Sequence, residues 1–422
     1  MKNYYSILLL LLFVACRKQY DVALPDQRWD LFESANAVAL KDTVRNKLQG
    51  VFAIGAGATD FGSLAALKWS YNVNGTDTTY YLSVFCETDV SYFIMQGKRL
   101  DSSILLNGYW RKMTGTSTGK ARLTISAANG GRKLLTGAVF NSGDIVIDGV
   151  YGNGDEVPTA PIRFQYARPL YNARPLEIVV HRGGGQTADL LPASENSAQI
   201  IQWASRFGAT GVEIDVRLTR DGVPILYHDD NLSERLIVKN GLIGPVEDYT
   251  YDQLNTMVRL IRNNERIPTL REALQTVVYS TPLKYVWLDT KFHGNMQLMR
   301  DIQQEYMQRA AALGKPLEIT IGIPDETVFN NLTALPNYQN IPSVCELDVD
   351  FTQRANSGIW GPRWTLGIQT DKINLMHSQG RRAFVWTLDV PENIKQYMYT
   401  NLYDGILTDY PSIVAFYHYV RP

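Results

Sequence analysis

From residue 176 to the last residue, 422, short apolar strands alternate with segments of helical period, and this alternation constrains the fold more than any other feature. Strands that alternate with helices pair in parallel, because each helix carries the chain back across the sheet. Eight such units close into a (β/α)₈ barrel, which we predict here. The predicted strands cover residues 177–180, 211–216, 223–227, 285–289, 317–321, 344–347, 383–387 and 405–407.

The segment before this barrel has a different period. From residue 46 to residue 168, runs rich in Tyr, Val, Ile and Thr are separated by turn signals such as Asn74-Gly75. Asn and Gly adopt the positive φ angles of tight hairpins, so the pattern is typical of antiparallel strands. We therefore predict a smaller all-β domain, a barrel or a sandwich, over residues 46–168, followed by the (β/α)₈ barrel over residues 174–422.

The N-terminus has the pattern of an export signal. Lys2 precedes an apolar run over residues 7–15, which is about half the length of a bilayer-spanning helix. The sequence Phe13-Val14-Ala15-Cys16 resembles the cleavage box of bacterial lipoproteins. This implies a signal peptide over residues 1–16, a lipid on Cys16 and a membrane-anchored protein at the outer membrane or periplasmic face. Residues 17–45 would form a tether with a short helix, and an ordinary secretory signal is the alternative.

Composition excludes one large class of partner. The chain has 41 Lys and Arg residues against 42 Asp and Glu residues, a formal net charge of −1. A chain this close to neutral has no field that would hold a polyanion, which argues against nucleic-acid binding. Any phosphate must therefore be bound locally, by a few side chains in one site.

Polar residues cluster where the first four predicted barrel strands end. His181-Arg182 follows the first strand, Glu213-Ile214-Asp215 lies in the second, His228 follows the third, and Asp289-Thr290-Lys291 ends the fourth. Active sites of (β/α)₈ barrels form at the carboxyl ends of the strands. We therefore expect these side chains to converge.

The acids indicate a metal site. Glu213 and Asp215 are two residues apart on a strand, so their side chains leave the same face about 6.6 Å apart. Their mutual repulsion is relieved by one divalent cation, and Asp289 is a natural third ligand. An all-oxygen set favours Mg²⁺ or Ca²⁺ over zinc. The simpler alternative, surface ion pairs with Arg217 or Arg220, does not account for the other strand ends.

The histidines and the cations complete a candidate catalytic set. His181 and His228 have imidazoles that can take or give a proton near neutral pH, so the two could act as a base and an acid. Arg182 and Lys291 can donate hydrogen bonds to phosphate oxygens.

Read in order, these residues form a series that resembles the glycerophosphodiester phosphodiesterase family over about residues 176–418. Each short motif alone is common, but their joint order is specific. The series comprises His181-Arg182-Gly183, Glu195-Asn196-Ser197, Glu213-Ile214-Asp215-Val216, Thr219-Arg220-Asp221-Gly222, His228-Asp229, Ile267-Pro268-Thr269-Leu270 and Leu407-Thr408-Asp409-Tyr410-Pro411.

The resemblance implies metal-dependent hydrolysis of glycerophosphodiesters to glycerol 3-phosphate and an alcohol. It maps His181 and His228 onto the acid/base pair, Glu213 and Asp215 onto metal ligands, and Arg182 and Lys291 onto phosphate contacts. It also maps Asn196 and Trp386 onto residues that contact substrate.

Two features depart from the pattern. The family usually has Glu where Asp289 stands, and its proline next to the glutamate is displaced here, since Leu191-Pro192-Ala193-Ser194 precedes Glu195. An Asp followed two residues later by Lys also looks like sphingomyelinase D-type phospholipases, which are one alternative. A lipoprotein that binds phosphodiesters without cleaving them is the other.

Overall fold

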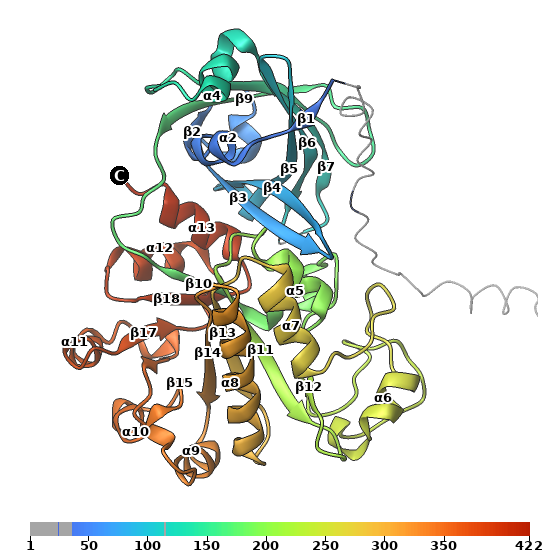
Figure 1. The fold of residues 1–422 in the computed structure, drawn as a ribbon, viewed down its shortest axis with the longest axis vertical. Coiled ribbons are helices and arrows are strands. Elements are labelled where there is room, and N and C mark those ends of the chain that lie inside the picture. Colours follow the sequence, from blue (N-terminus) through green and yellow to red (C-terminus); the bar gives the residue numbers. More distant parts are fainter. Residues whose placement is uncertain (1–23, 25–35, 114) are drawn as a thin grey trace, which may run out of the picture.

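The computed structural model describes Leu24 and residues 36–113 and 115–422. An all-β domain lies above a larger barrel domain in Figure 1. The predicted signal peptide, Cys16 and the short helix of the tether lie outside the described residues. Within the described residues, no helix has the length and apolar character needed to span a bilayer.

The first domain is a closed antiparallel barrel. Its strand order is β5-β4-β3-β2-β9-β8-β7-β6, and β5 also pairs with β6, which closes the sheet and decides between barrel and sandwich. The short β1 (Val38–Ala39) pairs with β5 as an addition. The barrel strands are β2 (Gly50–Ile54), β3 (Leu64–Asn74), β4 (Asp77–Cys86), β5 (Ser91–Leu100), β6 (Ser103–Lys112), β7 (Thr118–Ile125), β8 (Val146–Tyr151) and β9 (Ala160–Arg168). The helices α2 (Asp42–Lys47), α3 (Ala58–Phe61) and α4 (Arg132–Thr136) connect them.

Apolar side chains fill the interior of this barrel. Leu67, Phe93, Leu106 and Phe164 are fully buried there because alternate residues of each strand face inward. Aromatic rings pack edge to face, with the centroids of Phe93 and Phe164 5.9 Å apart. The interior is therefore a packed core.

The second domain is the predicted (β/α)₈ barrel. Eight parallel strands form one sheet, and β10 pairs with both β11 and β18, which closes it. The strands are β10 (Glu177–Val180), β11 (Gly211–Leu218), β13 (Tyr285–Thr290), β14 (Glu318–Ile323), β15 (Ser343–Cys345), β16 (Ile359–Trp360), β17 (Arg382–Val385) and β18 (Gly405–Thr408). The predicted fold class is confirmed.

The list of barrel strands needs one correction. The predicted third strand is β12 (Pro224–Leu226), which pairs antiparallel with β11 as a hairpin extension. The turn Thr219-Arg220-Asp221-Gly222 is too short for the crossover that a parallel strand needs. The barrel strand that the prediction lacked is β16, the sixth in chain order, whose two residues, Ile359 and Trp360, are too few to show a period in the sequence.

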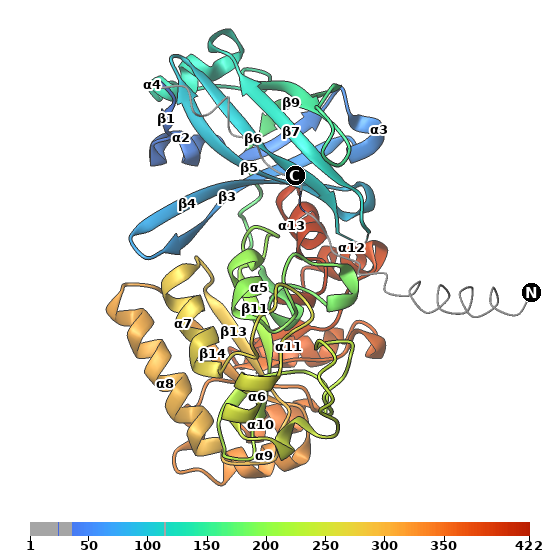
Figure 2. The same ribbon diagram turned by 90° about the vertical axis from the view of Figure 1, so that its right-hand side faces the viewer.

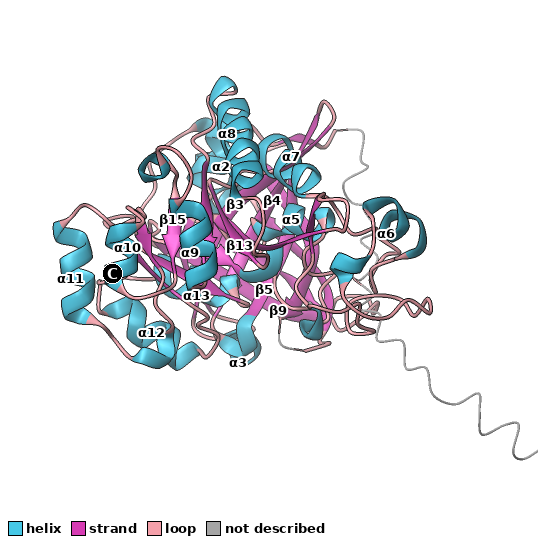
Figure 3. Ribbon diagram, turned by 90° about the horizontal axis from the view of Figure 1, so that it is seen from below, coloured by secondary structure: helices cyan, strands magenta, loops and turns pink. Residues whose placement is uncertain are grey.

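Helices surround the parallel strands, as Figure 3 shows. In α7 the buried residues recur at helical spacing, and Thr269 and Glu272 form a capping box at its start. The helices are α5 (Ala198–Ala204), α6 (Tyr251–Met257), α7 (Leu270–Ser280), α8 (Met296–Ala312), α9 (Glu326–Thr333), α10 (Val349–Arg354), α11 (Thr370–Ser378), α12 (Pro391–Tyr399) and α13 (Pro411–Tyr419).

The two domains share an extensive buried interface. The outer face of β3 to β6 lies against α5 and α13 (Figure 2), and Phe85 and Ile413 belong to one apolar cluster there. The guanidinium of Arg206 lies 3.7 Å from the ring of Tyr81 and donates to Asn72 Oδ1 at 2.8 Å. The domains are thus joined by direct packing as well as by the connecting chain.

One residue of this interface should make stability depend on pH. His418 in α13 is buried beside Tyr171, and burial together with Arg421 and Lys68 lowers its pKa to about 4. An unfolded histidine binds its proton near pH 6.5, so the folded state resists protonation between these values. The stabilisation is complete above pH 6.5 and is lost as the pH falls toward 4.

We expect the unfolding free energy of the wild type to fall by about 2 kcal/mol more than that of His418→Gln between pH 7.5 and pH 5. Urea unfolding at the two pH values measures this difference. His293→Gln, at an exposed position, is the matched control. Equal pH dependence in the wild type and His418→Gln would contradict the prediction.

Candidate active site

The polar residues at the strand ends converge in one cavity of about 310 Å³. In the parallel pair of β11 and β13, Asp215 is in register with Asp289, so the sheet itself brings the two acids together. Asp215 is fully buried beneath the cavity. Of the predicted site residues, those that line the cavity are His181, Arg182, Glu213, His228, Asp289, Lys291 and Trp386.

Three carboxylates form a group that could hold a metal ion. Glu213, Asp215 and Asp289 each offer one oxygen, and these oxygens lie within 4.8 Å of one another. Glu213 Oε1, Asp215 Oδ1 and Asp289 Oδ1 are buried without a hydrogen-bond partner, although Lys291 Nζ lies 3.3 Å from Asp215 Oδ1. Burial and the neighbouring acids raise the pKa values of Glu213 and Asp289. A hard divalent cation fits this all-oxygen set and would keep the acids ionised.

Asn196 has a different place from the one predicted. Its Nδ2 donates to Asp215 Oδ2 at 2.7 Å, and its Oδ1 accepts from the backbone N–H of Asp215 at 3.0 Å. Both amide atoms are thus occupied, and the side chain is buried. Asn196 orients a carboxylate of the metal group rather than facing the cavity.

His181 is fixed by a carboxylate on the last strand of the barrel. Its Nδ1 lies 2.8 Å from Asp409 Oδ1, just after β18, and its Nε2 lies 3.8 Å from Glu213 Oε2. Burial lowers the pKa of His181, but the hydrogen bond to Asp409 and the charge of Glu213 outweigh it and raise the pKa to about 9. The imidazole thus lies between two acids that favour its protonated form.

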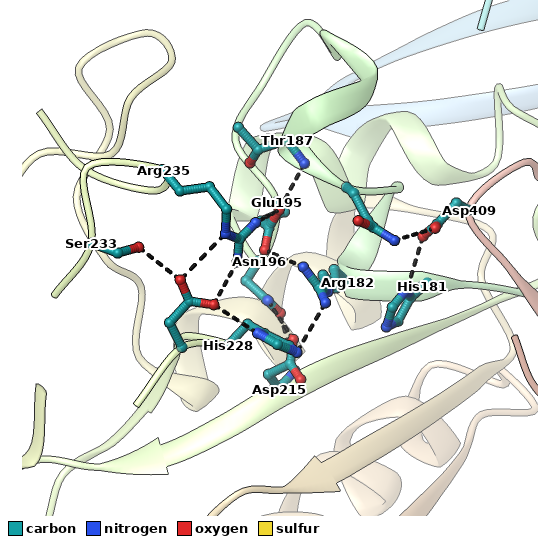
Figure 4. A network of polar contacts seen from close by, with 12 residues as sticks. His181, Arg182, Thr187, Glu195, Asn196, Asp215, His228, Ser233, Arg235 and Asp409 are labelled. Atoms are coloured by element: carbon teal, nitrogen blue, oxygen red, sulfur yellow. Dashed lines mark hydrogen bonds and ion pairs between the residues drawn. The ribbon is translucent and has the colours of Figure 1, made fainter. Parts of the chain in front are cut away.

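His228 lies between a carboxylate and a guanidinium. Its Nδ1 is 2.9 Å from Asp229 Oδ1, and its Nε2 is 2.9 Å from Nη2 of Arg182. A guanidinium can only donate, so Nε2 must accept and the proton of the neutral ring lies on Nδ1. Figure 4 shows His228 beside Arg182.

An ion-pair network orients Arg182. Its Nη1 donates to Glu195 Oε1 at 2.9 Å, and Arg235 donates to the other oxygen of Glu195 at 2.9 Å (Figure 4). Arg235 also donates to Asp229 at 2.6 Å, so one network joins the partners of both Arg182 and His228. Arg235 comes from the irregular segment after β12, where no sequence pattern marked it.

Two further residues of the cavity were missed from the sequence. Glu346 follows β15 and Arg363 follows β16, and both line the cavity beside Trp386. The Arg363 guanidinium lies 4.7 Å from the centroid of the Trp386 ring, and Glu346 Oε1 is buried without a hydrogen-bond partner. Glu346 was placed inside the predicted strand 344–347, and the strand before Arg363 was not predicted at all.

The fold and the site define a (β/α)₈ barrel with an acid cluster and two histidines at the carboxyl ends of its strands. Residues 181–326 match the model described as the Glycerophosphoryl diester phosphodiesterase family. This segment of the barrel domain is therefore similar to that family.

Curated relatives align with parts of the same domain. The chain is 32% identical over 165 residues to Glycerophosphodiester phosphodiesterase 1 of Rattus norvegicus, which covers 35% of this chain and 46% of that protein. It is 30% identical over 105 residues to the Glycerophosphodiester phosphodiesterase of Caldanaerobacter subterraneus subsp. tengcongensis, which covers 24% of this chain and 40% of the relative. The chain thus spans less than half the length of these relatives.

A solved structure shows a weaker overall likeness. The glycerophosphodiester phosphodiesterase from Parabacteroides distasonis matches with 21% identity and a TM-score of 0.45. The match covers 57% of this chain and 96% of that one.

Proposed function

We propose that the barrel domain hydrolyses glycerophosphodiesters to glycerol 3-phosphate and an alcohol. The observation that carries the proposal is that His181, His228, Glu213 and Asp289 line one cavity, with the Asp215 carboxylate close to both acids, in a segment that matches the family model. Pure binding of a phosphodiester needs no acid/base pair, whereas its hydrolysis does.

The surroundings of the two histidines favour different roles. Nε2 of His228 accepts from Nη2 of Arg182, so in the neutral ring this nitrogen carries the lone pair. Nε2 of His181 faces the carboxylate of Glu213, which favours the protonated form of the His181 ring. We therefore propose that His228 takes the proton of the glycerol hydroxyl as it attacks phosphorus, and that His181 delivers a proton to the departing alcohol oxygen. Water then opens the resulting cyclic phosphate to glycerol 3-phosphate.

Two cationic side chains of the cavity can stabilise negative charge on the phosphate. Arg182 is oriented by Glu195, and Lys291 extends from the end of β13, so both can donate to phosphate oxygens as negative charge grows on them. A Mg²⁺ or Ca²⁺ ion held by Glu213, Asp215 and Asp289 would add charge stabilisation at the same oxygens. Asn196 would keep Asp215 in the orientation that such an ion needs.

Release of glycerol 3-phosphate tests the proposal. The purified protein is incubated with glycerophosphocholine, glycerophosphoethanolamine, glycerophosphoglycerol and a lysophospholipid, each with Mg²⁺ and with Ca²⁺. We expect release from the glycerophosphodiesters. Turnover of the lysophospholipid alone would instead support the phospholipase alternative, and binding without release would support the non-catalytic one.

We also propose that Cys16 carries lipid and anchors the protein to a membrane facing the periplasm. The support is the sequence Phe13-Val14-Ala15-Cys16 after an apolar run. Expressed in bacteria with radiolabelled palmitate, the wild type is expected to incorporate label and to sediment with membranes. Cys16→Ser is expected to do neither, and labelling that persists in this variant would contradict the proposal.

A further inference from the structure

We infer that the β domain is a working part of the active site, because the end of β6 positions the loop that joins His181 to Glu195. Tyr109, Arg111 and Met113 alternate along this strand and its continuation, so they share the face directed at the barrel domain. The residue between them, Trp110, belongs to the interior core of the β domain. The inference rests on the proposed function for its kinetic readout.

Arg111 holds the middle of this loop. The residue is completely buried, and its Nη2 donates to the backbone carbonyl of Leu190. Leu190 has a φ of +55°, a left-handed conformation that is unfavourable for a non-glycine residue. Such a conformation persists where the surroundings enforce it, and here Arg111 supplies a strong contact from another domain.

Met113 packs against the same loop. It is fully buried in one apolar cluster with Leu191, and Ser412 Oγ lies 3.6 Å from its sulfur. A methyl group on Gly185 would lie 3.8 Å from the Met113 terminal carbon and 3.1 Å from the Asp409 carbonyl oxygen. Met113 therefore packs where the loop passes the residue that fixes His181.

The loop in turn binds two carboxylates that orient His181 and Arg182. Gln186 Nε2 donates to the same Asp409 carboxylate that binds His181, and the backbone N–H of Thr187 donates to Glu195 Oε2 at 2.7 Å. Glu195 orients Arg182. Displacement of the loop would thus loosen His181 and Arg182. Arg111 and Met113 do not line the cavity, so they act as positioning residues.

The test compares variants at two ends of the domain interface. Arg111→Met and Met113→Ala remove the contacts with the loop. Asn72→Ala is the matched control, because Asn72 bonds across the same interface to the carbonyls of Gln202 and Ser280, away from the loop. Each variant is assayed for kcat, for KM, for melting temperature, and for amide hydrogen exchange in residues 183–191 measured by mass spectrometry.

We expect Arg111→Met to lower kcat at least tenfold with KM changed less than threefold, and to speed exchange of the loop, with Met113→Ala smaller in the same direction. Asn72→Ala should keep kcat within twofold even where its melting temperature falls. Equal kcat in Arg111→Met and Asn72→Ala, or kcat losses that simply follow melting temperature, would overturn the inference. If the wild type shows no turnover, the proposed function fails, and unchanged loop exchange in Arg111→Met would separately refute the positioning role. Where Met113→Ala does not fold, Met113→Leu replaces it.

Discussion

Replacing either His181 or His228 by alanine is expected to lower kcat for glycerophosphodiesters by about 10²- to 10⁴-fold, the usual contribution of a positioned acid or base. Both imidazoles line the cavity, and each is held by its own carboxylate, Asp409 for His181 and Asp229 for His228. Because the proposed mechanism has one ring take a proton and the other give one, neither is expected to substitute for its partner. Initial rates of glycerol 3-phosphate release measure the loss.

The matched control is His293→Ala. His293 is exposed and pairs with Asp325 outside the cavity, so its loss should leave kcat within twofold. Circular dichroism establishes that each variant is folded. A folded His181→Ala or His228→Ala with near-normal kcat would remove that residue from the proposed mechanism.

Removing divalent cations is expected to abolish turnover, and adding Mg²⁺ or Ca²⁺ should restore it. Each of the three acids offers one oxygen within 4.8 Å of the others, and each also has a buried oxygen without a hydrogen-bond partner. A bound cation stabilises such a group of acids. Glu213→Gln and Asp289→Asn should each weaken binding of the restoring ion at least tenfold, as measured by calorimetry on the apoprotein.

Asp289→Glu is the informative companion to these variants. It keeps the charge and gives the longer arm that the resembled family usually has at this position, so ion binding should stay within about tenfold of wild type, roughly 1.4 kcal/mol. Full turnover after exhaustive chelation would contradict a role for the ion, whatever the variants bind.

Much of the fold could be predicted because its signals are local. The strand and helix periods identified the parallel barrel, and the polar residues after its strands marked the edge where the site lies. The hairpin strand β12 was mistaken for a barrel strand because period alone does not reveal the direction of pairing. The barrel strand missing from the prediction, β16, has only two residues, and it pairs with neighbouring strands of the sheet.

Only part of the candidate site could be predicted, because some of its contacts depend on residues distant in the sequence. Residue types at strand ends brought His181, Glu213 and Asp289 to notice, but the direction of a side chain depends on partners that fold in from elsewhere. Asn196 turns to Asp215 because that carboxylate and its backbone N–H match both atoms of the amide. Arg235 reaches Glu195 from an irregular segment, where no periodicity exists to be read.

The buried interface between the β3 to β6 face and helices α5 and α13 also determines how the protein unfolds. Separating the halves would expose Phe85, Phe207 and Ile413 to water together, and that shared apolar surface couples their melting. The described chain should therefore lose its structure in one cooperative step on heating. A fragment that starts at residue 174 would expose the apolar surface of this interface and aggregate.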